Sequence, residues 1–148
     1  MEAALRPAQI NVEAPADSTT GTVNVTVKTA AGSSTVAVSM QAVMPGLFTP
    51  AAAHAGDTIE LYATGLGATT TPVPPGLVFS GAYPTTTLPT VTIGGANAQV
   101  SYCGLVAAGL YQINVAVPGS LAAGTYAVVA TQNDVQSPST AELKIAGN

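Results

Sequence analysis

Apolar and polar residues alternate with a period of two along most of this 148-residue chain. In TVNVTVK, residues 22–28, every second position is a valine, the pattern of a strand that buries one face. The same alternation occurs in segments 34–43, 57–65, 89–95, 98–103, 110–117, 124–131 and 140–146. No segment combines the helical period of about 3.6 residues with capping residues at its ends. The pattern predicts an all-β fold built from short strands.

The low number of charged residues excludes several classes of partner. Only 7% of the residues are charged, the net charge is −4, and the strong cations are limited to Arg6, Lys28 and Lys144. A nucleic-acid interface needs several basic residues to neutralise phosphates, and an anionic membrane surface attracts clusters of them. No run reaches the roughly 18 consecutive apolar residues of a membrane-spanning helix. We therefore expect neither a nucleic-acid partner nor a membrane partner.

The phrase QINV occurs twice, at residues 9–12 and 112–115. A shift of 103 positions (112 − 9 = 103) aligns the two copies and their surroundings without a gap. The identical pairs are Gln9/Gln112, Ile10/Ile113, Asn11/Asn114, Val12/Val115, Pro15/Pro118, Gly21/Gly124, Thr22/Thr125, Val25/Val128 and Ser34/Ser137. Because a proline and a glycine keep the same register, the match indicates an internal repeat of one structural unit.

Four further motifs follow one another between residues 44 and 145: MPGLFT, LYATGLG, VTIGGANAQV and YQINVAVP with a following GTYAVV. Their order resembles that of IPT/TIG-type immunoglobulin-like domains. It is still more similar to the uncharacterised C-terminal module of large secreted proteins of Solibacter-like acidobacteria. The chain departs from that module at YCGLVAAG, where we would expect YAGLAPG. The resemblance implies an immunoglobulin-like β-sandwich of the IPT/E-set type.

The repeat and the resemblance together predict two units. Residues 44–148 form one complete module, whereas residues 1–43 contain only the closing strands of another, because no LYATGLG or VTIGG strand precedes the first QINV. Half a sandwich leaves an apolar face or a strand edge uncovered. The first unit could pack on the complete module, be completed by a second copy, or be completed by a neighbouring immunoglobulin-like module. Of these, we expect self-association.

The N-terminal sequence MEAALRPAQ has no apolar segment of the kind found in signal peptides. The surface composition, rich in Thr, Ser, Ala and Gly and poor in Lys, is nevertheless typical of secreted bacterial modules. We expect the chain to be a piece of a longer exported protein and its location to be extracellular.

Several motif residues have predicted structural roles. Gly65 and Gly67 in TGLG are expected to supply a positive φ or a close backbone approach. Gly94 and Gly95 are expected to form a tight hairpin turn. The uncharged, proline-rich segment 67–90 is predicted to be a long surface loop.

Candidate catalytic residues are few. His54 is the single histidine and Asp57 follows three positions later, so a hydrolase would have to use this pair with a serine supplied by the fold. The chain has no G-x-S-x-G motif, and its acidic residues are scattered singly. We therefore expect no catalytic site, no metal site and no cofactor, with His54 in a linker and Asp57 in a turn. Cys103 cannot form an internal disulfide, since it is the single cysteine, and it is expected in the core.

Glycan binding is the main alternative function. Sugar-binding surfaces use exposed aromatic rings, above all tryptophan, and the chain has no Trp, five Tyr and two Phe. Tyr83 and Tyr111 are the candidate ligand-binding residues, although most aromatic residues are expected in the core. The sequence thus favours a non-catalytic structural, adhesive or spacer module. A carbohydrate-binding accessory module is the first alternative, and a hydrolase using His54 is the second.

Overall fold

The computed structural model describes residues 19–73 and 79–147, and all regular elements within these ranges are β-strands. The all-β prediction is confirmed for this part of the chain; the first QINV lies outside it. The strands are β1 (Gly21–Thr29), β2 (Gly32–Met40), β3 (Gly46–Leu47), β4 (Thr58–Thr64), β5 (Tyr83–Pro84), β6 (Thr90–Ile93), β7 (Ala96–Ala107), β8 (Leu110–Ala116), β9 (Gly124–Gln132), β10 (Val135–Gln136) and β11 (Ala141–Ile145).

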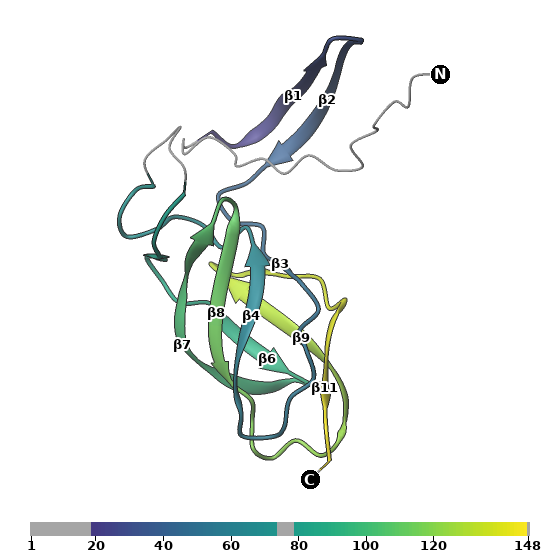
Figure 1. The fold of residues 1–148 in the computed structure, drawn as a ribbon, viewed down its shortest axis with the longest axis vertical. Coiled ribbons are helices and arrows are strands. Elements are labelled where there is room, and N and C mark those ends of the chain that lie inside the picture. Colours follow the sequence, from purple (N-terminus) through teal and green to yellow (C-terminus); the bar gives the residue numbers. More distant parts are fainter. Residues whose placement is uncertain (1–18, 74–78, 148) are drawn as a thin grey trace.

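The strands separate into two groups. β1 and β2 form an antiparallel hairpin that pairs with no other described strand, and Figure 1 shows it standing apart at one end of the molecule. The remaining strands pair in the order β10-β9-β6-β7-β8-β4-β3, with β11 also on β9 and β5 also on β7. The start of β7 pairs with β6, whereas the rest of β7 pairs with β8. The strand β7 therefore passes from one sheet to the other.

The two sheets enclose one apolar core, an arrangement consistent with a β-sandwich. The alternation of the sequence places every second residue of β4, β8, β9 and β11 inside. The fully buried side chains with the largest volumes are Leu61, Leu66, Ile93, Ile113, Leu143, Val91, Val115, Val128 and Cys103. They come from both sheets, so the core is shared between them.

The segment that leads into the sandwich is fixed to its last strand. Ala53 forms a parallel bridge with Ile145 of β11. The Ala53 N–H donates to the Lys144 carbonyl at 3.0 Å, and the Ala146 N–H donates to the Ala53 carbonyl at 2.8 Å. The beginning and the end of this unit are thus joined by backbone hydrogen bonds.

The glycines of TGLG have the predicted roles. Gly65 and Gly67 have φ values of 69° and 87°, a region that disfavours residues with a Cβ. The Met44 N–H donates to the Gly65 carbonyl at 2.9 Å, which brings the incoming chain against the end of β4. A Cβ on Gly65 would overlap the Met44 carbonyl, and one on Gly67 would lie 2.9 Å from Val43 Cγ1. Both a positive φ and a close backbone approach are therefore confirmed.

The predicted loop 67–90 is partly extended and is anchored to β7. Within its described residues, Tyr83 and Pro84 form the short strand β5 against β7, and Thr69 bridges to Thr85. Thr85 is buried, and its hydroxyl donates to the Thr87 carbonyl at 2.8 Å. Most described residues of the segment lie outside regular strands, in keeping with the predicted surface loop, and threonine hydroxyls and the edge of β7 satisfy part of its backbone.

Candidate functional site

The His54–Asp57 pair forms a tight turn just before β4. The His54 N–H donates to Asp57 Oδ2 at 2.8 Å, and the Asp57 N–H donates to the His54 carbonyl at 3.2 Å. The imidazole Nδ1 lies 3.6 Å from the same carboxylate oxygen, with the two side chains 54% and 47% exposed. An aspartate that accepts a backbone N–H across three residues is the ordinary stabiliser of such a turn.

The two residues that a hydrolase would have to use are therefore adjacent, but within the described ranges no serine hydroxyl hydrogen-bonds to His54. Across the same residues, no three His, Cys, Asp or Glu side chains gather as a group able to hold a metal ion. The arrangement forms a turn with a solvent-exposed imidazole beside the Asp57 carboxylate.

The two predicted ligand-binding tyrosines are both engaged within the fold. Tyr111 lies on the core-facing side of β8 and packs against the core cluster, and its hydroxyl donates to the Gly67 carbonyl at 2.6 Å. The Tyr83 ring contacts the Phe79 ring edge to face, with centroids 5.5 Å apart. Tyr83 of β5 and Tyr111 of β8 both pair with Leu105 of β7, so the fold places them at the same register position on either side of that strand.

A row of polar side chains lies on the opposite, outer side of β4 and β8; we call Glu60, Tyr62, Gln112 and Asn114 the outer polar row. Tyr62 pairs with Gln112 and Glu60 with Asn114 across the two strands. The Tyr62 hydroxyl donates to Glu60 Oε2 at 3.1 Å, and Gln112 Nε2 donates to Asn114 Oδ1 at 2.8 Å. The hydrogen bond to Glu60, and then its negative charge, raise the pKa of Tyr62.

The outer polar row was not assigned as a candidate site from the sequence. Alternation places Glu60 with Tyr62, and Gln112 with Asn114, on one side of their own strands. Nothing in the sequence, however, indicates that β4 and β8 are neighbours. Tyr62 is 39% exposed, and it is the tyrosine best placed to offer a ring to a ligand.

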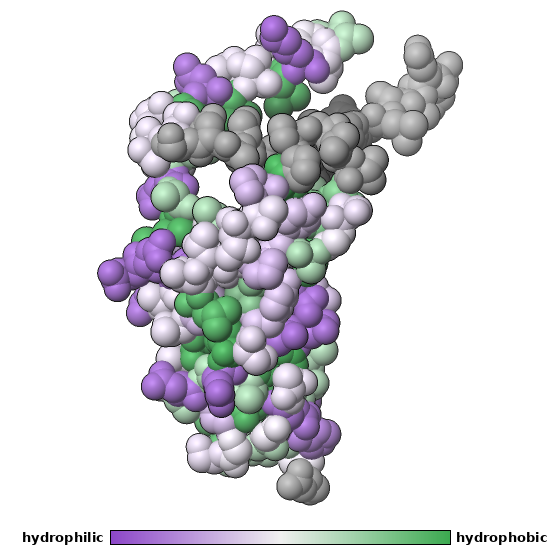
Figure 2. Space-filling view, turned by 90° about the vertical axis from the view of Figure 1, so that its left-hand side faces the viewer, coloured by the Kyte–Doolittle hydropathy of each residue, from purple (hydrophilic) through white to green (hydrophobic). Residues whose placement is uncertain are grey.

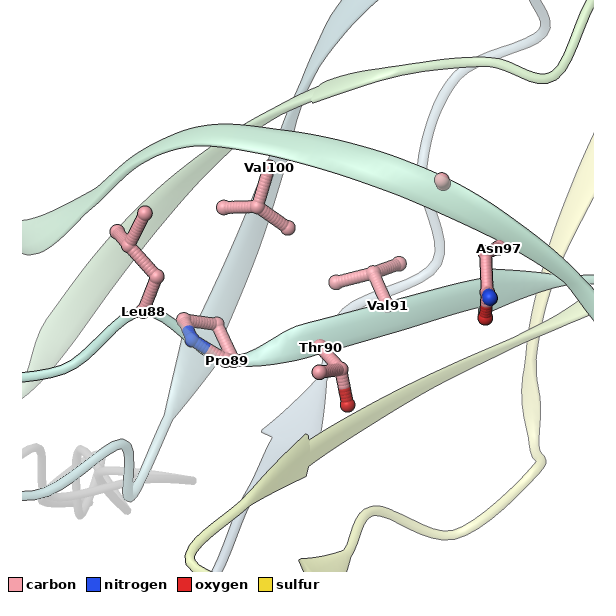
Figure 3. Close-up of a pocket in the computed structure, with 7 residues that line it drawn as sticks. Leu88, Pro89, Thr90, Val91, Asn97 and Val100 are labelled. Carbon is pink, nitrogen blue, oxygen red and sulfur yellow. The ribbon is translucent and has the colours of Figure 1, made fainter.

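A shallow apolar depression lies where β6 meets the start of β7 (Figure 3). It has a volume of about 310 Å³ and is lined by Leu88, Pro89, Thr90, Val91, Asn97, Ala98 and Val100. No lining residue is charged. Specific small-molecule sites usually combine an apolar wall with convergent polar groups, and here the polar side chains are limited to those of Thr90 and Asn97.

The hairpin β1–β2 has one apolar and one polar face. We call Val23, Val25, Val27, Val36 and Val38 its valine face. Cross-strand pairing places Val23 opposite Val38 and Val25 opposite Val36. Four of these side chains are 38–58% exposed, and Figure 2 shows hydrophobic residues at the surface of the hairpin at the top of the molecule. The other face carries threonines, serines and Lys28.

Cys103 is in the core as predicted, with 1% of its surface exposed. Burial raises the pKa of its thiol, and a hydrogen bond from Thr85 opposes that shift. We expect Cys103 to react with a disulfide reagent at pH 8 at least about 100-fold more slowly in the native protein than in guanidinium, because reaction requires an exposed thiolate. Equal rates would show that the native core opens readily.

The same raised pKa predicts how stability depends on pH. The thiol ionises first in the unfolded chain, so the unfolded state binds fewer protons than the native state once pH exceeds about 8.5. We expect the free energy of unfolding to fall as pH rises above that value and the slope to disappear in Cys103→Ala. Urea unfolding between pH 7 and pH 9 measures it, below the range in which Tyr62, whose pKa is also raised, contributes. An identical slope in the variant would assign the effect to other groups.

A comparison with protein-family models and with curated protein sequences finds no match to this chain. Within residues 19–73 and 79–147, the structure contains no helix that is long and apolar enough to cross a membrane.

Proposed function

We propose that this chain is a non-catalytic structural or adhesive module that acts through protein contacts of its β1–β2 hairpin. In this proposal residues 44–148 are an immunoglobulin-like sandwich of the IPT/TIG type and the protein is extracellular. Its partners are further copies of the chain or neighbouring modules of the same kind, and no cofactor takes part.

The observation that carries the proposal is the exposed valine face. In the described part of the chain, four of the eight large hydrophobic residues that are exposed lie on this hairpin, so exposed apolar surface is concentrated there. Apolar surface gathered in one place favours contact with another protein. The composition supports the same conclusion, since 7% charged residues give little material for catalysis or for binding charged ligands.

A glycan array tests this proposal against the first alternative, a carbohydrate-binding accessory module. The outer polar row favours that alternative, because it places an exposed tyrosine beside amide and carboxylate groups. We expect no glycan to be retained above background. Retention that is lost in Tyr62→Ala and kept in Tyr83→Ala would replace the proposal with glycan binding on the outer polar row.

A panel of chromogenic esters and glycosides tests the second alternative, a hydrolase that uses His54. His54 and Asp57 are 3.6 Å apart, so a single substitution removes the pair. We expect the wild-type protein to hydrolyse none of these substrates in a way that depends on His54. Any background turnover should be the same in His54→Ala. Turnover that is lost in both His54→Ala and His54→Gln, with both variants still folded, would contradict a non-catalytic role, because neither replacement can transfer a proton. Turnover that survives both would exclude His54 as its source.

A further inference from the structure

The internal repeat shows what the hairpin lacks. Adding 103 to the bounds of β1 (21 + 103 = 124, 29 + 103 = 132) gives the bounds of β9. The pairing agrees as well, since the pair Thr29–Gly32 corresponds to Gln132–Val135, which joins β9 to β10. The hairpin is therefore the structural counterpart of β9 with the strand segments that follow it.

Three valines of the valine face correspond to residues that are completely buried in the second copy, whereas Val23 corresponds to the partly buried Tyr126 and Val36 to the exposed Ser139. Val25, Val27 and Val38 correspond to Val128, Ala130 and Ala141, which are 0%, 0% and 2% exposed. Those residues are covered because β9 also pairs with β6 and faces the opposite sheet. Within the described ranges, β1 pairs with β2 alone, so the same pattern of residues remains at the surface.

The repeat also indicates what kind of surface would cover the valine face. In the second copy the corresponding residues pack against an apolar sheet face. β6 of another copy cannot supply a strand, because both of its edges are already paired, with β7 and with β9. Among the described residues of another copy, the sheet face that is both apolar and exposed is the valine face. That face carries no charge, since Lys28 points to the opposite side of the hairpin, so two valine faces can meet without desolvating an ion.

We propose that two copies of this chain associate by packing their valine faces together, which forms a small two-layer β-structure around a two-fold axis. The proposal deepens the proposed function, on which it rests, by naming the partner. The pairs Val23–Val38 and Val25–Val36 lie side by side in the hairpin, so a two-fold axis near them places valines opposite valines.

The small size of the face limits how strong this association can be. Two strands of 9 residues present a face of about 30 Å by 10 Å, or roughly 300 Å² in each copy. The total of roughly 600 Å² is about half of the smallest standard interface. The dimer is therefore weak, with a dissociation constant on the order of 10–100 μM, and becomes substantial where copies are held close together.

Sedimentation equilibrium of the full chain from 5 to 500 μM tests the proposal, a range chosen to bracket the dissociation constant on the order of 10–100 μM. We expect a reversible monomer–dimer equilibrium. The double variant Val25→Thr/Val36→Thr keeps β-branched side chains in both strands but adds hydroxyls to the centre of the interface. It should weaken dimerisation at least about tenfold. The control Asn24→Thr changes the polar face of the same hairpin and should leave the dissociation constant within about twofold, since it lies outside the interface.

A second measurement identifies the contact. In a mixture of isotope-labelled and unlabelled copies, filtered NMR spectra should show contacts between the methyl groups of Val25 or Val36 and valines of the other copy. Three results would overturn the proposal: a monomer throughout the range, equal dimerisation of both variants, or valine contacts confined to one chain. None of them bears on the glycan and hydrolase tests, so failure of the dimer is distinguishable from failure of the proposed function.

Discussion

Gly65→Ala is expected to lower the free energy of unfolding by at least about 3 kcal/mol, a change of roughly 10 °C in melting temperature for a domain of this size. Two costs add at this position. The φ of 69° costs an alanine about 1–2 kcal/mol. The new methyl group would also overlap the Met44 carbonyl, so the hydrogen bond from Met44 to Gly65 must break or lengthen.

Gly95→Ala is the matched control for this prediction. Gly95 has a φ of 81°, yet a Cβ built on it meets no atom within 4 Å. Its replacement should therefore cost only the conformational part, about 1–2 kcal/mol. Urea unfolding of both variants measures the difference. Equal losses would mean that the segment before β3 moves away from β4 without cost.

Leu143→Ala is expected to destabilise the protein by about 2–5 kcal/mol, because it removes a side chain with no exposed surface from the shared core. Leu143 lies in β11 and contributes to the core cluster enclosed by both sheets. The remaining cavity cannot collapse easily, since each neighbouring strand is held by hydrogen bonds to another strand.

Met40→Ala is the matched control, because Met40 corresponds to Leu143 in the first copy of the repeat (143 − 103 = 40). It lies in the hairpin and not in the core of the sandwich. Met40 lies at the end of β2 and is only partly buried. We expect a loss below about 1 kcal/mol at 5 μM protein, a concentration at which hairpin contacts between copies are few. A loss comparable to that of Leu143→Ala would show that the hairpin has a buried cover within one chain.

The alternation of the sequence was sufficient to predict the strands but not their partners. The valines of residues 22–28 define one face of β1 whether or not anything covers that face. Exposure depends on which strands are adjacent, and adjacency is a property of the whole topology. The repeat supplied part of that information, because it relates β1 and β2 to β9 and the strand segments that follow β9.

For the same reason, the sequence did not predict which tyrosine is exposed beside polar groups. Tyr111 precedes the QINV motif and was a reasonable candidate for a ligand, but the alternation of β8 directs its ring to the core side. Tyr62 has no distinctive sequence context, and its position beside Gln112 follows from the pairing of β4 with β8. These strands are separated by more than 40 residues, and no local pattern encodes their contact.

The parallel bridge between Ala53 and Ile145 has a mechanical consequence for a module that connects other parts of a protein. The chain enters the sandwich beside the strand by which it leaves, and both segments run in the same direction. A tension applied at the two ends would pull these segments past each other and load the two hydrogen bonds of Ala53 together. Bonds that share a shearing load resist more force than bonds that open one after another, so this junction would resist extension of the sandwich after the shorter β3–β4 contact had opened.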